Sequence, residues 1–161
     1  MDEKLLYKMV VISDIHYGSD NLVRIIPIIN ESNYLIFCGD GLRQLMLFRD
    51  EIRVPIVCVK GNNDYNTKIA EHASIVLGQT RAFVTHGHKQ NVRKGVGLLI
   101  DAARMKNCNL VFFGHTHVYY DYTAGGIHFI NPGALCEGSY AMVIGDGVNF
   151  TSKQCTVTEG F

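Results

Sequence analysis

The stretch Phe112-Phe113-Gly114-His115-Thr116-His117 places two histidines two residues apart, directly after the apolar run 110–113. An apolar run of this length is typical of a buried strand, and the glycine after it predicts a sharp turn. At the carboxyl end of a strand, an H-x-H pair can direct both imidazoles into one crevice. The stretch therefore predicts a site at one edge of a buried sheet.

Four more polar clusters follow apolar runs in the same way. They are Asp14-Ile15-His16, Gly39-Asp40, Gly61-Asn62-Asn63-Asp64 and His86-Gly87-His88. The first three follow the apolar runs 9–13, 34–38 and 55–59, which alternate with segments of helical apolar periodicity. This order predicts a parallel α/β layout. Because right-handed crossovers bring the ends of parallel strands to one edge, the clusters are expected to meet there.

The remainder of the chain predicts a second sheet. Residues 74–77 and 81–85 form a strand pair around Gly78, and 94–106 has helical periodicity. After residue 118, short strand-like runs at 119–122, 126–130, 140–144 and 148–151 are separated by glycine-rich turns, which predicts a largely antiparallel second sheet. We therefore expect one α/β domain over residues 1–161, a four-layer α/β/β/α sandwich of two mixed sheets flanked by helices. Pro27 predicts a kink or an early end in the first helix.

Composition limits the function classes. The formal net charge of zero disfavours non-specific nucleic-acid binding, which needs a basic surface. No apolar run approaches the roughly 20 residues of a membrane span, and the amino terminus does not have the pattern of a signal peptide. A cytoplasmic protein without a membrane partner is expected. Five cysteines without a C-x-x-C motif predict reduced, mostly buried thiols.

The polar clusters contain a candidate set of metal ligands. Its members are Asp14, His16, Asp40, Asn62, His86, His115 and His117. Carboxylate, imidazole and amide oxygen are ligands for manganese, iron, cobalt, nickel and zinc. Seven ligands are too many for one such ion, but they suit two ions that share a carboxylate. Two ions about 3.5–4 Å apart can hold a hydroxide for in-line attack, and their rough excess of positive charge favours an anionic phosphoryl substrate.

The motifs Asp-x-His, Gly-Asp, Gly-Asn-x-Asp, His-Gly-His and Gly-His-x-His, in this order, resemble those of the calcineurin-like metallophosphoesterase superfamily. With the stretch Ile130-Asn131-Pro132-Gly133 and the short length, the chain is most similar to the YfcE-type small phosphodiesterase subgroup. The resemblance implies the four-layer sandwich and two divalent ions, usually Mn²⁺, with Ni²⁺, Zn²⁺, Fe²⁺ or Co²⁺ as alternatives. It implies that Asp14, His16 and His117 hold the first ion, that Asn62, His86 and His115 hold the second, and that Asp40 bridges them.

Three further residues are candidates for substrate contact or for support of the site, namely Asn63, Asp64 and His88. Many superfamily members have a histidine at the position of Asn63, where it contacts the scissile phosphate. Asparagine cannot supply a proton near neutral pH, which predicts a preference for diesters with good leaving groups. Asp64 is expected to orient its loop rather than to bind an ion. His88 could contact the substrate or cap its loop.

The leading hypothesis is a dinuclear phosphodiesterase that hydrolyses a small or nucleotide-like diester by attack of a metal-bridging hydroxide. One alternative is a protein-interaction scaffold on the same fold, like the retromer subunit of the superfamily, which the complete set of ligand types disfavours. Another is a mononuclear hydrolase in which the remaining ligands are structural. A homo-oligomer formed through an exposed strand edge is also compatible with the sequence.

Overall fold

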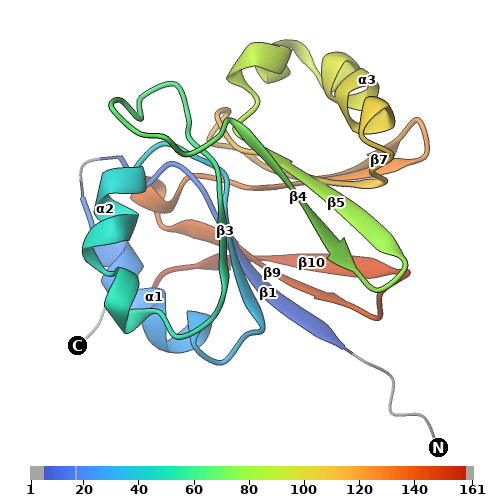
Figure 1. The fold of residues 1–161 in the computed structure, drawn as a ribbon. Coiled ribbons are helices and arrows are strands. Elements are labelled where there is room, and N and C mark those ends of the chain that lie inside the picture. The colour runs from blue at the N-terminus through green and yellow to red at the C-terminus, as the bar shows by residue number, and fades with distance from the viewer. Residues whose placement is uncertain (1–5, 17, 159–161) are drawn as a thin grey trace, which may run out of the picture.

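The computed structural model describes residues 6–16 and 18–158. Within these residues ten strands form two five-stranded sheets, and helices lie on the outer face of each sheet (Figure 1). The strand order is β10-β9-β1-β2-β3 in the first sheet and β4-β5-β6-β8-β7 in the second. The predicted four-layer sandwich of two mixed sheets is confirmed.

The elements have the following bounds. The first sheet consists of β1 (Tyr7–Ile12), β2 (Tyr34–Phe37), β3 (Ile56–Cys58), β9 (Ser139–Gly145) and β10 (Phe150–Thr156). The second consists of β4 (His72–Leu77), β5 (Thr80–Thr85), β6 (Leu110–Phe112), β7 (Tyr119–Ala124) and β8 (Ile127–Pro132). The α-helices are α1 (Asp20–Ile29), α2 (Leu42–Leu47) and α3 (Gly97–Met105). Short 3-10 helices are η1 (Arg49–Glu51), η2 (His88–Gln90), η3 (Val92–Lys94) and η4 (Leu135–Glu137).

The strands β1, β2 and β3 pair in parallel, as their apolar runs predict. The prediction that 140–144 and 148–151 belong to the second sheet was wrong. Both predicted hairpins form, but β9 pairs antiparallel with β1, and β10 extends the first sheet beyond it. Turn patterns indicate which strands are neighbours along the chain, whereas the free edge of β1 decides which sheet the β9–β10 hairpin joins.

The second sheet is mixed rather than largely antiparallel. Its hairpins β4–β5 and β7–β8 are antiparallel, but β6 lies parallel to both β5 and β8. The helix predicted over 94–106 begins only at Gly97, because Gly95 has φ of 126°, which an α-helix does not accommodate. The helix α1 continues past Pro27 to Ile29, and Asn30 N still donates to Ile26 O at 2.9 Å.

Three apolar clusters hold the layers together. Side chains such as Ile36 and Phe112 pack between the two sheets. The outer face of the first sheet packs against α1 and α2 through residues such as Phe37 and Ile25. The outer face of the second sheet packs against α3, where Leu99 meets its strands. Full burial of each such large side chain stabilises the fold by about 1.5–3 kcal/mol, so the strand ends that carry the polar clusters stand on rigid elements.

Two further sequence predictions concern membranes and thiols. Across the described residues, the helices are too short or too polar to cross a lipid bilayer. All five cysteines are free thiols, but only Cys38 and Cys108 are buried, and Cys136 is exposed. Cys58 and Cys155 are half-buried, because β3 and β10 are the edge strands of the first sheet. Cys136 lies in a turn after β8 that the apolar pattern did not identify, so the prediction of mostly buried thiols was wrong.

Candidate metal centre

The polar clusters meet where the carboxyl ends of β1 and β2 face those of β5 and β6. Backbone hydrogen bonds tie these loops together. Asp14 N donates to Gly39 O at 2.9 Å within the first sheet, and Gly114 N donates to His86 O at 3.1 Å within the second. The structure brings together six of the seven ligands predicted from the sequence, namely Asp14, His16, Asp40, His86, His115 and His117.

Five of these six residues have left-handed backbone conformations. Their φ values are 56° for Asp14, 56° for His16, 65° for Asp40, 72° for His115 and 63° for His117. In the described part of the chain the other non-glycine residues with positive φ are three asparagines, which tolerate this conformation. Aspartate tolerates it to a similar degree, whereas for the three histidines it costs roughly 1–2 kcal/mol each. Strain of this kind concentrates at functional sites, where the surrounding structure enforces it.

The first group of ligand atoms has the spacing of a metal site. His16 Nε2 lies 3.1 Å from His117 Nε2. Asp14 Oδ1 lies 3.2 Å from His117 Nε2 and 3.6 Å from His16 Nε2. Donors that hold zinc tetrahedrally at their usual bond lengths are about 3.3 Å apart. The three atoms therefore lie close to the geometry of one tetrahedral face.

Asp14 has a buried carboxylate oxygen without a hydrogen-bond partner. Its Oδ2 accepts hydrogen bonds from Ser13 Oγ at 2.6 Å and from His115 N at 3.2 Å. Its Oδ1 has no hydrogen-bond partner among the described residues. Burial raises the pKa of Asp14, although the charge of His86 opposes this. An unpartnered buried carboxylate oxygen is costly, and a divalent cation bound to Oδ1 would remove that cost.

The second group is built around His86. Its Nε2 lies 3.3 Å from Asp40 Oδ2 and 3.2 Å from His115 Nδ1. Its Nδ1 lies 2.7 Å from the carbonyl oxygen of Cys38, which requires a proton on Nδ1 and leaves Nε2 to bind an ion in the neutral tautomer. Asp40 also has an oxygen within 4.8 Å of ligand atoms of Asp14 and His16, so it reaches both groups.

The charges of the second group shift its pKa values. Burial acts to raise the pKa of Asp40, but hydrogen bonding and charge from His86, with hydrogen bonds from Asn63, lower it to about 2. Burial acts to lower the pKa of His86, but Asp40 and Asp14 outweigh it and raise the pKa. Burial and the charge of His86 lower the pKa of His115 to about 4. His115 is therefore neutral at pH 7, as a metal ligand must be.

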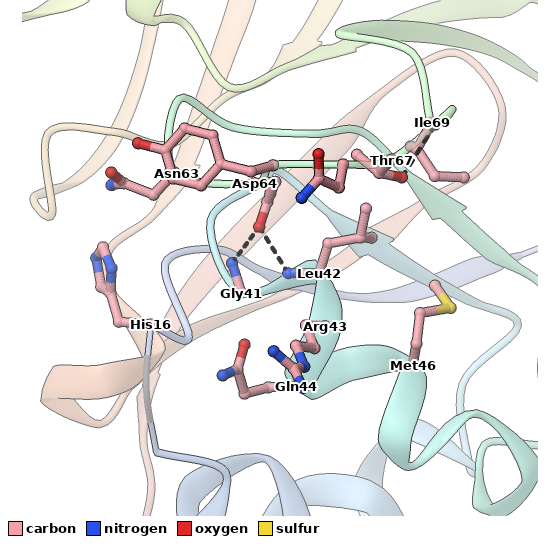
Figure 2. A pocket seen from close by; sticks show the side chains of 12 residues that line it. His16, Gly41, Leu42, Arg43, Gln44, Met46, Asn63, Asp64, Thr67 and Ile69 are labelled. Carbon is pink, nitrogen blue, oxygen red and sulfur yellow. Dashed lines mark hydrogen bonds between the residues drawn. The ribbon is translucent and has the colours of Figure 1, made fainter.

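Asp64 holds the loop that carries Asp40. Its Oδ2 accepts from Asp40 N at 2.8 Å and from Gly61 N at 2.8 Å. Its Oδ1 accepts from Gly41 N at 2.9 Å and from Leu42 N at 3.0 Å (Figure 2). Because both carboxylate oxygens are used in this way, Asp64 positions the β2 and β3 loops relative to each other.

The remaining sequence candidates lie around the second group. Asn63 donates to both oxygens of Asp40, from its backbone N at 2.9 Å and from Nδ2 at 3.0 Å. Asn62 has an exposed side chain, and the described residues offer it no hydrogen bond to the cluster. The His88 ring lies 5.5 Å from the His86 ring, and its Nδ1 is buried without a partner in the described structure. Burial, together with the charge of His86, lowers the pKa of His88.

Two motif glycines allow the loops to approach closely. A Cβ on Gly114 would lie 2.0 Å from Ser13 Oγ. A Cβ on Gly61 would lie 2.1 Å from Asp40 Oδ1. Asn131 completes the support of the His115 loop, since its Nδ2 donates to Gly114 O at 3.1 Å and to Thr116 Oγ1 at 3.0 Å. The close contacts at Gly114 and Gly61 leave no room for a side chain, so both positions require glycine.

Sequence reasoning missed two residues on η4. Cys136 Sγ lies within 4.8 Å of ring nitrogens of His16 and His117. Glu137 Oε1 lies 3.7 Å from His117 Nδ1. Their only sequence signal is their position shortly after Asn131-Pro132-Gly133, and no periodic pattern places that turn beside β1.

A cavity of about 720 Å³ opens beside the cluster (Figure 2). His16 and Asn63 form its wall on the side of the candidate metal ligands. The rest of the lining comes from α2 and from the loop after β3, including Arg43, Met46 and Tyr65. This volume lies within the range of about 300–1,000 Å³ that is usual for small-molecule sites.

The chain resembles known phosphoesterases in sequence. The family model for the calcineurin-like phosphoesterase superfamily domain matches residues 7–146. A probable metallophosphoesterase of Mycoplasma genitalium is 31% identical over 134 residues, which cover 81% of this chain and 78% of that protein. A phosphodiesterase of Methanocaldococcus jannaschii is 27% identical over 146 residues, which cover 80% of this chain and 84% of that protein.

Solved structures with the same fold lead to the same family. A conserved protein of Streptococcus pneumoniae, itself a predicted phosphoesterase, has a TM-score of 0.78 at 26% identity, covering 94% of this chain and 90% of its own. The protein Vps29 of Entamoeba histolytica, solved with zinc, has a TM-score of 0.75 at 18% identity, covering 94% and 99%. At that identity the likeness to Vps29 shows the fold alone. The match of the family model over residues 7–146 shows that the chain belongs to the calcineurin-like phosphoesterase superfamily.

Proposed function

We propose that this chain is a phosphodiesterase that depends on two divalent metal ions. The observation that carries the proposal is Oδ1 of the buried Asp14, which has no hydrogen-bond partner in the described structure and faces the ring nitrogens of His16 and His117. Membership of the superfamily and the likeness to the M. jannaschii phosphodiesterase support it. The donor set of carboxylate oxygen and imidazole nitrogen fits first-row divalent ions.

The ligand atoms divide between two ions. Asp14, His16 and His117 would hold the first. His86, His115 and Asn62 would hold the second, for which the exposed Asn62 has to turn inward. Asp40 would be shared, since its oxygens reach both groups. When bound, two such ions activate water for in-line attack and neutralise charge on the phosphoryl group, with Mn²⁺ the ion expected from the subgroup.

The residues around the ligands then act on the substrate. Asn63 lines the cavity and can donate a hydrogen bond from Nδ2 to a phosphoryl oxygen, but it has no proton to give to a leaving group. Without a general acid at this position, the leaving group departs as an anion. Diesters with acidic leaving groups are therefore the preferred substrates.

The cavity suits a small organic or nucleotide-like diester. Tyr65 is 77% exposed beside it, which leaves its ring free to stack on a base or another planar group. The exposed Arg43 lies in the same lining and can pair with a second anionic group. Both features favour a substrate that extends from the metal ligands toward α2.

Metal analysis and hydrolysis assays test the proposal together. The chelator-treated protein would be reconstituted with Mn²⁺, and bound metal would be measured alongside hydrolysis of a chromogenic phosphodiester and its matching monoester. We expect about two ions per chain and metal-dependent hydrolysis, faster for the diester. One ion or none would contradict the dinuclear centre.

Two bound ions without turnover would instead favour the second candidate, a protein-interaction scaffold. The fold shared with Vps29 of E. histolytica favours that candidate, although at 18% identity. The complete set of ligand types in this chain favours the enzyme.

A further inference from the structure

A thiol lies beside the first group of metal ligands. Cys136 Sγ and one ring nitrogen from each of His16 and His117 all lie within 4.8 Å of one another. The superfamily motifs supply the histidines, whereas Cys136 lies in η4, outside every motif identified in the sequence. The observation therefore adds a sulfur donor to a group that otherwise consists of nitrogen and oxygen.

Backbone hydrogen bonds fix the position of this thiol. Leu135 N donates to Ser13 O at 2.8 Å, and Cys136 N donates to Asp14 O at 3.0 Å. From α1, Asn21 Nδ2 donates to Leu135 O at 2.8 Å. The turn that carries Cys136 is thus bonded to the same backbone segment that carries Asp14. A thiol held in this way can serve as a preorganised ligand.

A second observation points to a cation at the same place. Asp14 is fully buried, and its unpartnered Oδ1 is directed at the His16 and His117 nitrogens, 3.6 and 3.2 Å away. On the other side of His117, Glu137 Oε1 lies 3.7 Å from Nδ1. A carboxylate near Nδ1 favours the tautomer in which Nε2 binds an ion. Three donor atoms therefore converge, and the thiol lies within 4.8 Å of ring nitrogens of two of these residues, His16 and His117.

We propose that Cys136 is a fourth protein ligand to the ion held by Asp14, His16 and His117. The inference rests on the proposed metal centre. It makes the first position a set of one oxygen, two nitrogens and one sulfur, while the described ligands of the second position are oxygen and nitrogen only. Thiolate selects zinc-like ions over manganese. The first position therefore binds Zn²⁺ or Co²⁺ in preference to Mn²⁺, and the second retains the manganese expected for the subgroup.

Binding through sulfur requires the loss of the thiol proton. In the absence of an ion, the partial desolvation of the thiol and the negative charges of Glu137 and Asp14 raise the pKa of Cys136. When the ion binds, the S–H bond breaks, a sulfur–metal bond forms, and the proton passes to the solvent.

Cobalt spectroscopy tests the inference directly. The metal-free protein would be titrated with Co²⁺, and its spectrum compared with those of Cys136→Ser and of the control Cys155→Ser, whose thiol lies in β10. We expect a thiolate-to-cobalt charge-transfer band in the wild type and the control, and no such band in Cys136→Ser. Competition with a chelator should show that Cys136→Ser weakens Zn²⁺ binding at one position by at least about 10-fold, with Mn²⁺ binding nearly unchanged.

The outcomes separate this inference from the proposed function. Bound cobalt without a charge-transfer band in the wild type, or a band that persists in Cys136→Ser, would overturn the role of Cys136 and leave the metal centre intact. Absence of any cobalt binding would overturn the metal centre itself, and the inference with it. Because Cys136 is exposed, its replacement by serine should leave the melting temperature of the metal-free protein unchanged, and this can be checked in the same samples.

Discussion

At the scale of single residues, several proposed ligands adopt a left-handed backbone conformation that non-glycine residues rarely adopt. Asp14, Asp40 and His115 have φ values of 56°, 65° and 72°. These conformations persist because hydrogen bonds hold the loops in place. Asp64, for example, accepts hydrogen bonds from four backbone N–H groups. The cost of the site is therefore distributed over the loops, and removal of one ligand affects its neighbours.

Asp40→Ala should abolish the binding of both ions and the phosphodiesterase activity. The physical reason is that Asp40 reaches both ligand groups, with Oδ2 3.3 Å from His86 Nε2. Metal content per chain and hydrolysis of a chromogenic diester measure the effect. Asp50→Ala, at an exposed position in η1, is the matched control and should retain both. Turnover by Asp40→Ala with two bound ions would refute the bridging role.

Asn63→His should increase the hydrolysis of esters with poor leaving groups. A histidine there can donate a proton, and general acid catalysis contributes roughly 10²–10⁴-fold where it operates. Rates across a series of leaving groups would be compared with those of Asn63→Gln, which keeps the amide. We expect a flatter dependence on leaving-group pKa only for the histidine variant. An unchanged series would remove Asn63 from the leaving-group argument.

Metal binding should release protons near neutral pH. Asp40 and Asp14 raise the pKa of His86 above its ordinary value of 6.5, despite the opposing effect of burial. Below that raised pKa the metal-free site holds a proton that an ion must displace, so apparent affinity falls as the pH falls. Calorimetric Mn²⁺ titrations at pH 6, 7 and 8, in buffers of different ionisation enthalpy, measure the protons released. An affinity independent of pH over this range would contradict the prediction.

At the scale of secondary-structure elements, the site depends on how closely the loops at the strand ends pack. The His115 loop approaches the end of β1 at Gly114, where a Cβ would meet Ser13 Oγ at 2.0 Å and Asp14 Oδ2 at 3.0 Å. Because Gly114 has no side chain, the loop of His115 can approach Asp14 at the end of β1.

Gly114→Ala should destabilise the protein and weaken metal binding. Overpacking of this kind costs about 1–3 kcal/mol, and the forced displacement involves Ser13 and Asp14 directly. Gly97→Ala is the control, because a Cβ there meets nothing within 4 Å at the start of α3. Thermal unfolding of the metal-free proteins and Mn²⁺ affinity are the measurements. Equal melting temperatures for the two variants would show that the loops accommodate the added methyl group without loss of stability, which would contradict the prediction.

At the scale of the whole molecule, the proposed ligands come from two separate sheets. Asp14 and Asp40 follow strands of the first sheet, whereas His86 and His115 follow strands of the second. The apolar cluster that includes Ile36 and Phe112 packs between the same sheets. An ion bound by the proposed ligands would therefore crosslink two layers that are otherwise held mainly by apolar contacts.

Addition of Mn²⁺ should raise the melting temperature. Ions that bind the folded state stabilise it by about 2.7 kcal/mol when free metal is 100 times the dissociation constant. Differential scanning calorimetry with and without Mn²⁺, followed by chelation, measures the shift and its reversal. Asp40→Ala should show no shift, and a shift of wild-type size in that variant would mean that the stabilising ion binds elsewhere.

The sequence by itself determined the layers, the parallel strands β1, β2 and β3, and the polar clusters at strand ends, because apolar periodicity and turn residues act locally. Only the tertiary structure decided that the β9–β10 hairpin joins the first sheet, since several edges can accept a hairpin of the same apolar pattern. The tertiary structure alone also showed that Cys136 lies beside His16 and His117 and that the side chain of Asn62 is exposed. These contacts join residues far apart in the chain, and they arise from the packing of one loop against another.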